Sequence, residues 1–273
     1  MKLEFIVDRI KELKESWHNE WVGVRTVYDT CVQRLGAASR DDQNLKRINA
    51  ILKGGNSIAN FVEHSYKKMA RTNREPNYHS RLHTAIVIES LTALIQKQRH
   101  IDGKTKIAID LPEATVLVAM VGHDAGHNGT RNGTPCQLES RSFELIQPLL
   151  RSANCDEKDI NRIKRIIWGT DPNLIIPLHC GANRTEFDLG NTVWQTVICQ
   201  EADILASVLP AFAEELTQHL ADEWRKIDPI SAAGLLSTNG RKYFLSQLAK
   251  FSTPTSISLG LASLVEKQLA ELS

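Results

Sequence analysis

A histidine and an aspartate stand side by side within residues 121–129 (VGHDAGHNG), directly after the apolar run 114–120. The run is long enough to form a buried helix. A His-Asp pair at the C-terminal end of such a helix is costly to bury unless a charged partner satisfies both side chains. Imidazole nitrogen and carboxylate oxygen both bind first-row divalent metals. We therefore predict that His123 and Asp124 are metal ligands.

Further metal-binding and acid–base side chains follow along the chain. His79 and His83 are four residues apart, which puts them on one face of a helix that begins by His79. His127 lies about one turn beyond the His-Asp pair. Much later, Glu201 and Asp203 stand in an otherwise apolar helix, and periodicity alone does not select one over the other. Each residue alone is more often a cap, a packed histidine or half of a salt bridge, but the order His, His-Asp, Asp is far more specific.

This order resembles the HD superfamily of metal-dependent phosphohydrolases. More narrowly, it resembles the catalytic domain of the class I 3′,5′-cyclic nucleotide phosphodiesterases, in that family's order, over about half of the chain. The segments that carry the resemblance are Tyr78-His79-Ser80 with His83-Thr84-Ala85, His123-Asp124-Ala125-Gly126-His127-Asn128-Gly129, Asn132, Leu138-Glu139-Ser140, Ile166-Ile167-Trp168-Gly169-Thr170-Asp171, and Glu201-Ala202-Asp203-Ile204.

The resemblance implies a role for each matching side chain. The ligands of a first metal would be His83, His123, Asp124 and Asp203. Asp124 would bridge to a second, more water-ligated metal, and His79 would be the general acid for the leaving O3′. A hydroxide that bridges the metals would be the nucleophile, and the product a nucleoside 5′-monophosphate. The residues around the metal-bound waters would be His127, Glu139, Thr170 and Asp171.

These residue types suit phosphodiester hydrolysis at neutral pH. A metal lowers the pKa of bound water far enough to supply hydroxide, and two metals can share that work and neutralise phosphate oxygens. The leaving alkoxide needs a proton from an acid of near-neutral pKa, which histidine provides. A helix with His79 and His83 one turn apart sets acid and metal on the same side of the substrate. The ligand types admit Zn²⁺, Mn²⁺ or Fe²⁺ at the tight site and Mg²⁺ or Mn²⁺ at the water-rich one.

Substrate-binding residues are expected beside the acid and near the C-terminus. Tyr78 precedes the acid, and Gln247 with Phe251 offers an amide and an aromatic ring, the types with which the family grips a purine. The spacing of Gln247 and Phe251 differs from the family's, and an ordinary amphipathic helix also explains it. We expect a small-molecule nucleotide such as cAMP or cGMP as the substrate.

Other functions compete with this hypothesis. A nucleotide phosphatase or triphosphohydrolase of the HD group would keep the metals, but His79 favours the phosphodiesterase pattern. A di-iron oxygenase of HD type needs two further histidine ligands between Asp124 and Asp203, where the sequence has only His127 and His179. A non-catalytic metal or nucleotide sensor with an intact site is the remaining alternative.

Helical spacing dominates the elements that must position these residues. Phe5, Ile6, Ile10, Leu13 and Trp17 recur at three- and four-residue steps. Similar patterns predict helices over 20–36, 44–70, 80–98, 112–123, 137–151, 157–168, 191–208, 210–226, 240–251 and 256–272. We find no alternating strand, fixed-period repeat or dividing linker. We predict an all-α, compact multi-helix bundle of the HD-domain type with the metal site at its centre.

That bundle is expected to be one domain, 1–273. Its expected parts are N-terminal helices over 1–70, a metal-site core over 71–210 and C-terminal helices over 211–273. The N-terminal part either covers the core or mediates homodimerisation. Loops are expected at 71–79, 124–136 and 169–190, beside the candidate residues.

The composition of the chain limits the classes of partner that we expect. Lys and Arg total 33 against 32 Asp and Glu, which argues against a nucleic acid or an acidic membrane as the main partner. The five cysteines are widely spaced and form no CxxC pair, so a disulfide framework is not expected. The N-terminus lacks the pattern of a signal peptide, and no apolar run reaches the length of a membrane span. We expect a cytoplasmic hydrolase.

Overall fold

Helices are the only regular elements in the described part of this computed structural model, which comprises residues 2–17, 19–40, 42–103 and 108–272. The prediction of an all-α chain is confirmed. The helices of the first half are α1 (Leu3–Ser16), α2 (Val24–Leu35), α3 (Leu45–Ala70), α4 (Arg81–Ile101), α5 (Leu111–Gly122) and α6 (Gln137–Ser152). Those of the second half are α7 (Glu157–Trp168), η1 (Pro172–Leu174), α8 (Ile175–Ala182), α9 (Thr192–Val208), α10 (Ala213–Trp224), α11 (Pro229–Leu235), α12 (Thr238–Tyr243), η2 (Phe244–Leu248), α13 (Pro254–Ser258) and α14 (Leu261–Glu271).

The centre of the fold is the pair α4 and α5, because both helices are buried on nearly every face. α4 packs against α9, α2, α5 and α1, and α5 packs against α3, α7 and α4. A helix that is apolar all round can be stable in water only when other helices cover it. The apolar run 114–120 therefore sits deep in the bundle, and it delivers His123 to the interior at its C-terminal end.

A capping box fixes where α5 begins. The Asp110 side chain accepts from the backbone N–H of Glu113, and the Glu113 carboxylate accepts from the N–H of Asp110. Such a cap contributes about 1 kcal/mol. Arg99 of α4 also donates to the Glu113 carboxylate, which ties the two central helices together. The register of α5, and hence the depth of His123, follows from this anchored start.

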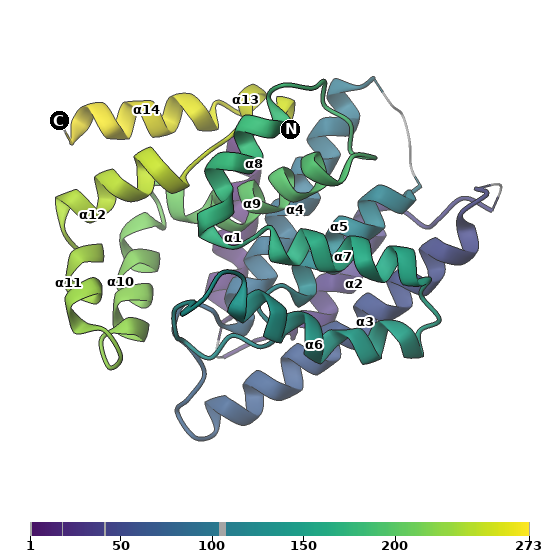
Figure 1. The fold of residues 1–273 in the computed structure, drawn as a ribbon, viewed down its shortest axis with the longest axis horizontal. Coiled ribbons are helices and arrows are strands. Elements are labelled where there is room, and N and C mark those ends of the chain that lie inside the picture. The colour runs from purple at the N-terminus through teal and green to yellow at the C-terminus, as the bar shows by residue number, and fades with distance from the viewer. Residues whose placement is uncertain (1, 18, 41, 104–107, 273) are drawn as a thin grey trace.

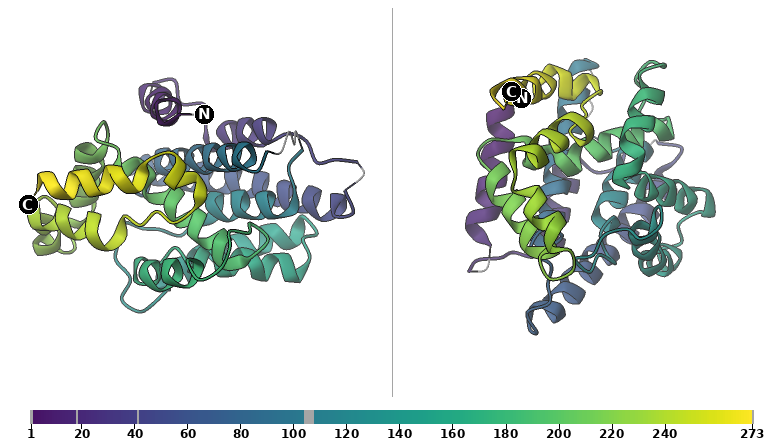
Figure 2. Two further views of the ribbon diagram at one scale, coloured as in Figure 1. Left: turned by 90° about the horizontal axis from the view of Figure 1, so that it is seen from above. Right: turned by 60° about the vertical axis from the view of Figure 1, so that its left-hand side comes forward.

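The outer helices lie on two sides of this centre. α1 runs along the outside of the bundle (Figure 2), where Arg9 pairs with the buried Glu89 of α4. α10, α11 and α12 lie together at one end, and α14 runs along the edge above them (Figure 1). α9 and α10 are bent by 103° relative to one another, and α10 reaches the loop before α4, where the N–H of Tyr78 donates to Glu223. In this way α10 comes to border the candidate site.

Some predicted boundaries differ from the structure. The expected loop 169–190 contains η1 and α8, because Pro177 lies in the first turn of α8, where the missing N–H has no helical partner to lose. The expected helix 256–272 is split into α13 and α14 at Gly260, whose φ of +74° suits glycine. The expected helix 240–251 is divided into α12 and the π-helical turn η2, and it ends at Leu248.

No single helix in the described ranges has both the length and the apolar composition of a membrane span. The bent pair of α9 and α10 reaches these limits only when the two helices are taken together.

Candidate metal centre and acid–base pair

Two histidines and two aspartates from three helices meet at one point in the interior. His83 comes from the first turn of α4, His123 from the end of α5 and Asp203 from α9. The Nε2 atom of His83 lies 3.0 Å from Oδ1 of Asp203 and 3.4 Å from Oδ2 of Asp124. The Nε2 atom of His123 lies 3.0 Å from Oδ2 of Asp124 and 3.5 Å from Oδ1 of Asp203. The structure thus brings together all four predicted metal ligands.

The two imidazoles of this cluster direct their Nε2 atoms at the carboxylates. The Nε2 atoms of both His83 and His123 are buried and have no hydrogen-bond partner among the described residues. The Nδ1 atom of His123 lies 2.7 Å from the carbonyl oxygen of Met120, so Nδ1–H donates there and Nε2 is the ring nitrogen that faces the carboxylates. Unpaired nitrogens that face carboxylates are costly when buried without a ligand.

The ligand atoms of His83, His123 and Asp203 all lie within 4.8 Å of one another, near enough to surround one ion. Ligand atoms about 2.1 Å from a metal, with angles of about 90–110° between them, lie about 3.0–3.4 Å apart. The nitrogen–oxygen separations in the cluster span 3.0–3.5 Å. The donor set and its geometry therefore fit a divalent metal with nitrogen and oxygen ligands.

The electrostatics of the cluster also favour a cation. Burial lowers the pKa of His83, but the nearby carboxylates of Asp124 and Asp203 outweigh burial and raise it to about 9. Burial raises the pKa of both aspartates, but the adjacent histidines hold them well below their usual range. The two carboxylates thus stay charged and create a site of negative potential, which a proton or a metal can neutralise.

Neighbouring helices hold the ligands in place. The Ser80 hydroxyl caps α4 by accepting from the N–H of His83. Arg81, the next residue, pairs with Glu63 of α3 and with Glu75. The Tyr66 hydroxyl of α3 donates to the carbonyl oxygens of Asp124 and His127. The start of α4 and the turn after α5 are therefore both fastened to α3.

A second group of titratable side chains lies beside the cluster. The Nδ1 atom of His79 lies 2.6 Å from Oε1 of Glu223, at the end of α10. The other oxygen of Glu223 accepts from the backbone N–H groups of Tyr78 (3.0 Å) and His79 (3.1 Å). The Glu223 carboxylate is 2% exposed and the His79 ring 18% exposed. The buried carboxylate thus fixes the ring orientation and directs the Nδ1–H inward, so Nε2 of His79 is the atom available for proton transfer.

An electrostatic interaction joins His79 and Glu223. Burial raises the pKa of Glu223, but the charge and hydrogen bonds of His79 lower it below its ordinary value. Glu223 is therefore a carboxylate at neutral pH, and its charge faces the His79 ring. The pair has the arrangement of a histidine general acid with a buried carboxylate behind it.

His127 stacks on His79, with ring centroids 3.5 Å apart and planes at 21°. Its Nδ1 atom accepts from the N–H of Gly129, and burial together with the charge of His79 lowers its pKa to about 3. His79, His127 and Glu223 have ligand atoms near enough to surround an ion. However, Nδ1 of His127 is occupied by an N–H, and Nδ1 of His79 faces Glu223. This second group is therefore better suited to proton transfer than to metal binding.

A network of amide and carboxylate groups lies near Asp124 of the cluster. The Asn132 side chain donates to Glu139 (2.9 Å) and to Asp171 (3.4 Å). Asp171 is fully buried and accepts from the N–H of Cys136. Burial raises the pKa of Glu139, and the charges of Asp171 and Asp124 act in the same direction. The Thr170 hydroxyl, by contrast, donates to a carbonyl within its own helix end.

The predicted substrate-binding residues are separated in the structure. The Tyr78 ring lies 4.8 Å from both the His79 and the His83 rings, and its hydroxyl is 3.0 Å from that of Ser207. Gln247 is exposed at η2, and Phe251 packs in the hydrophobic core. Tyr78 thus borders the site, whereas Gln247 and Phe251 do not form an open amide–aromatic pair.

The structure distinguishes Glu201 from Asp203, which periodicity left as alternative candidate metal ligands. Glu201 is fully buried and accepts from the N–H groups of Ser252 and Thr253 and from the hydroxyls of Thr253 and Ser256. Its four acceptor bonds anchor the start of α13, whereas Asp203 faces the histidines. Glu223, on the other hand, was missed by the sequence analysis, because it stands among several acids on an amphipathic helix and only the fold brings it to His79.

Comparison with known proteins adds no relative: no protein-family model matches the chain, and no curated protein is significantly similar to it.

Proposed function

We propose that the protein is a metal-dependent phosphohydrolase that cleaves a phosphodiester, with a 3′,5′-cyclic nucleotide as its substrate and an HD-type arrangement around a central metal site. The observation that carries the proposal is the adjacency of two groups with complementary chemistry. One group has buried imidazole nitrogens without partners that face two carboxylates. The other is a histidine backed by a buried glutamate, and the rings of His79 and His83 are 5.7 Å apart.

The metal ligands in this proposal are His83, His123, Asp124 and Asp203. A divalent ion bound there supplies a water of lowered pKa and neutralises charge on the phosphate. A second ion would share Asp124 and take its other ligands from water. Nitrogen-rich coordination suits Zn²⁺, Mn²⁺ or Fe²⁺ at the first position, and oxygen-rich coordination suits Mg²⁺ or Mn²⁺ at the second.

The side chains of the chain itself supply the proton and the orientation. His79 holds a proton at Nε2 and delivers it to the leaving O3′ as the ester bond breaks. Glu223 keeps the ring oriented and stabilises its protonated form. His127 packs flat against His79 and stays neutral, so it restricts the ring without competing for the proton. Asn132 and Glu139 can orient water beside the metal ligands.

Product release from cAMP and cGMP by purified protein with added Mg²⁺ or Mn²⁺ tests the proposal. The comparison variants are His79→Ala and His64→Ala, the latter an exposed helical histidine. We expect turnover to the 5′-monophosphate in the wild type and in His64→Ala. In His79→Ala we expect turnover to be lost while bound metal persists. Failure to hydrolyse either nucleotide with metal bound would reject the cyclic-nucleotide assignment and direct attention to the triphosphohydrolase and oxygenase alternatives.

A further inference from the structure

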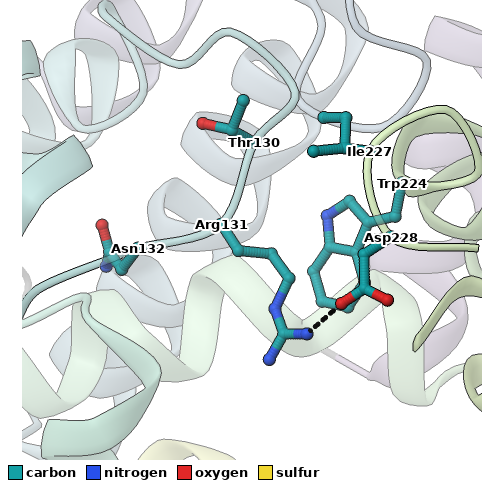
Figure 3. A pocket seen from close by; sticks show the side chains of 6 residues that line it. All are labelled: Thr130, Arg131, Asn132, Trp224, Ile227 and Asp228. Atoms are coloured by element: carbon teal, nitrogen blue, oxygen red, sulfur yellow. Dashed lines mark hydrogen bonds and ion pairs between the residues drawn. The ribbon is translucent and has the colours of Figure 1, made fainter. Parts of the chain in front are cut away.

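A pocket lies between the loop after α5 and the end of α10, the helix that carries Glu223 (Figure 3). Its volume is about 280 Å³, near the lower end of small-molecule sites. The residues that line it are Thr130, Arg131, Asn132, Trp224, Ile227 and Asp228. No step of the proposed reaction uses it.

Both walls of the pocket continue into the candidate site. On one wall, Asn132 donates to the Glu139 carboxylate. On the other, Trp224 directly follows Glu223, the partner of His79. Gly129 closes the gap between the walls: a Cβ atom there would lie 3.1 Å from Cγ of Glu223. A ligand in the pocket would therefore lie against the same loop and helix end that hold the acid.

One wall of the pocket carries a cation stacked on an aromatic ring. The guanidinium carbon of Arg131 lies 4.9 Å from the centroid of the Trp224 ring, so the cation stacks on the indole. Its Nη1 atom donates to Asp228 (2.9 Å) and to the Ser231 hydroxyl (2.7 Å). The acid and the hydroxyl thus hold the guanidinium beside the indole, and both planar groups line the pocket.

The pocket also contains a hydrogen-bond donor without a partner. The Nε1 atom of Trp224 is buried and has no hydrogen-bond partner in the described ranges of the chain. In Figure 3 this nitrogen lies on the edge of the indole that faces Thr130 and Arg131. A buried N–H without an acceptor is unfavourable, and a ligand with an acceptor at its edge would satisfy it.

We propose that this pocket binds the nucleobase of the substrate, an inference that rests on the proposed function. A purine or pyrimidine offers a face for the Arg131–Trp224 stack and for Ile227, and its edge carries acceptors for the indole N–H. A free phosphate is a poorer match, because the Asp228 carboxylate lines the same space. The pocket supplies the base contacts that Gln247 and Phe251 do not form.

Nitrogen-15 NMR of the indole N–H groups of the full chain tests this assignment, with adenosine and guanosine as probes. These nucleosides carry no phosphate, so they need no metal to bind. Loss of one resonance in Trp224→Phe identifies the signal of Trp224. We expect this resonance to shift saturably with at least one nucleoside and to stay in place with ribose 5-phosphate. The Trp194 resonance is the internal control, because its N–H already donates to the carbonyl of Glu186.

Arg131→Ala should weaken nucleoside binding about tenfold, since it removes the stacked cation. Arg151→Ala is the matched control, because Arg151 is equally exposed and also pairs with an acid. A Trp224 resonance that does not respond to millimolar nucleoside, or that responds equally to ribose 5-phosphate, overturns the inference. Nucleoside binding without any phosphodiester turnover would reject the proposed function alone. Turnover without a response at Trp224 would reject the base pocket alone.

Discussion

Substituting Glu223 by glutamine tests the role of the buried carboxylate. The change keeps size and shape but removes the charge that faces His79 at 2.6 Å. The remaining amide oxygen can still accept from the backbone N–H groups of Tyr78 and His79, so the loop stays anchored. The amide NH₂ group then faces Nδ1 of His79, where it opposes the protonated ring.

The size of the effect follows from the one interaction that is lost. A hydrogen bond to a charged group contributes about 1.5–3 kcal/mol. Since each 1.36 kcal/mol changes a rate about tenfold, kcat should fall about 10- to 150-fold. Glu223 does not line the pocket that we assign to the base, so KM should change little.

Steady-state turnover of a cyclic nucleotide by the wild type, Glu223→Gln, His79→Ala and the double variant measures this effect. Glu223 acts only through His79, so the double variant should be no slower than His79→Ala. Glu215→Gln, an exposed acid on the same helix, is the control. A kcat within twofold of the wild type in Glu223→Gln, or a further loss in the double variant, would refute the reasoning.

Three further predictions concern the surroundings of the site. Tyr66→Phe removes the hydroxyl that holds the turn after α5. Metal affinity, measured by competition with a chelator, should therefore fall about 10- to 100-fold. Unchanged affinity would contradict the structural role of Tyr66. Glu201→Gln should lower the free energy of unfolding by about 3 kcal/mol in urea without loss of bound metal, because it leaves buried donors of the segment before α13 unpaired. A loss of metal in this variant would mean that Glu201 is a ligand.

The third prediction concerns the pH dependence of the free energy of unfolding. Burial raises the pKa of Glu63, but the N–H of Val24 and the Arg81 guanidinium outweigh burial and lower it. This contribution to stability is complete above the unfolded pKa of about 4.3 and is lost as pH falls through the lower folded value. The wild type should therefore lose more unfolding free energy than Glu63→Gln between pH 6 and pH 3, as urea denaturation measures. Equal losses would contradict it.

Local sequence pattern predicted the central helices better than it predicted which distant segments pack against them. The apolar run 114–120 lies within one helix, so the sequence located it. The prediction that His79 and His83 share one helical face was wrong, because α4 begins at Arg81 after its cap Ser80 and His79 lies in the preceding loop. The choice of Asp203 over Glu201 depends on the segment 252–256, which packs on α9 from about 50 residues away. Periodicity within α9 contains no information about that contact.

Glu223 illustrates the same limit for the candidate site. The contact of Glu223 with His79 depends on the 103° bend between α9 and α10, and the residue types and spacing in α10 do not predict that bend. The loop expected over 169–190 contains α8, because Pro177 is compatible with the first turn of a helix even though proline often ends one. Contacts between distant segments, rather than local propensity, separate what could be predicted from what could not.

Hydrolysis of a cyclic nucleotide in ¹⁸O-labelled water, before and after metal removal, tests the central claim most directly. The account predicts that chelation abolishes turnover and that added Mg²⁺ or Mn²⁺ restores it. It also predicts that one ¹⁸O enters the 5′-phosphate, because water attacks phosphorus as O3′ leaves. Turnover that persists after the metal has been removed, or a metal-loaded protein that hydrolyses neither cAMP nor cGMP, would contradict the account.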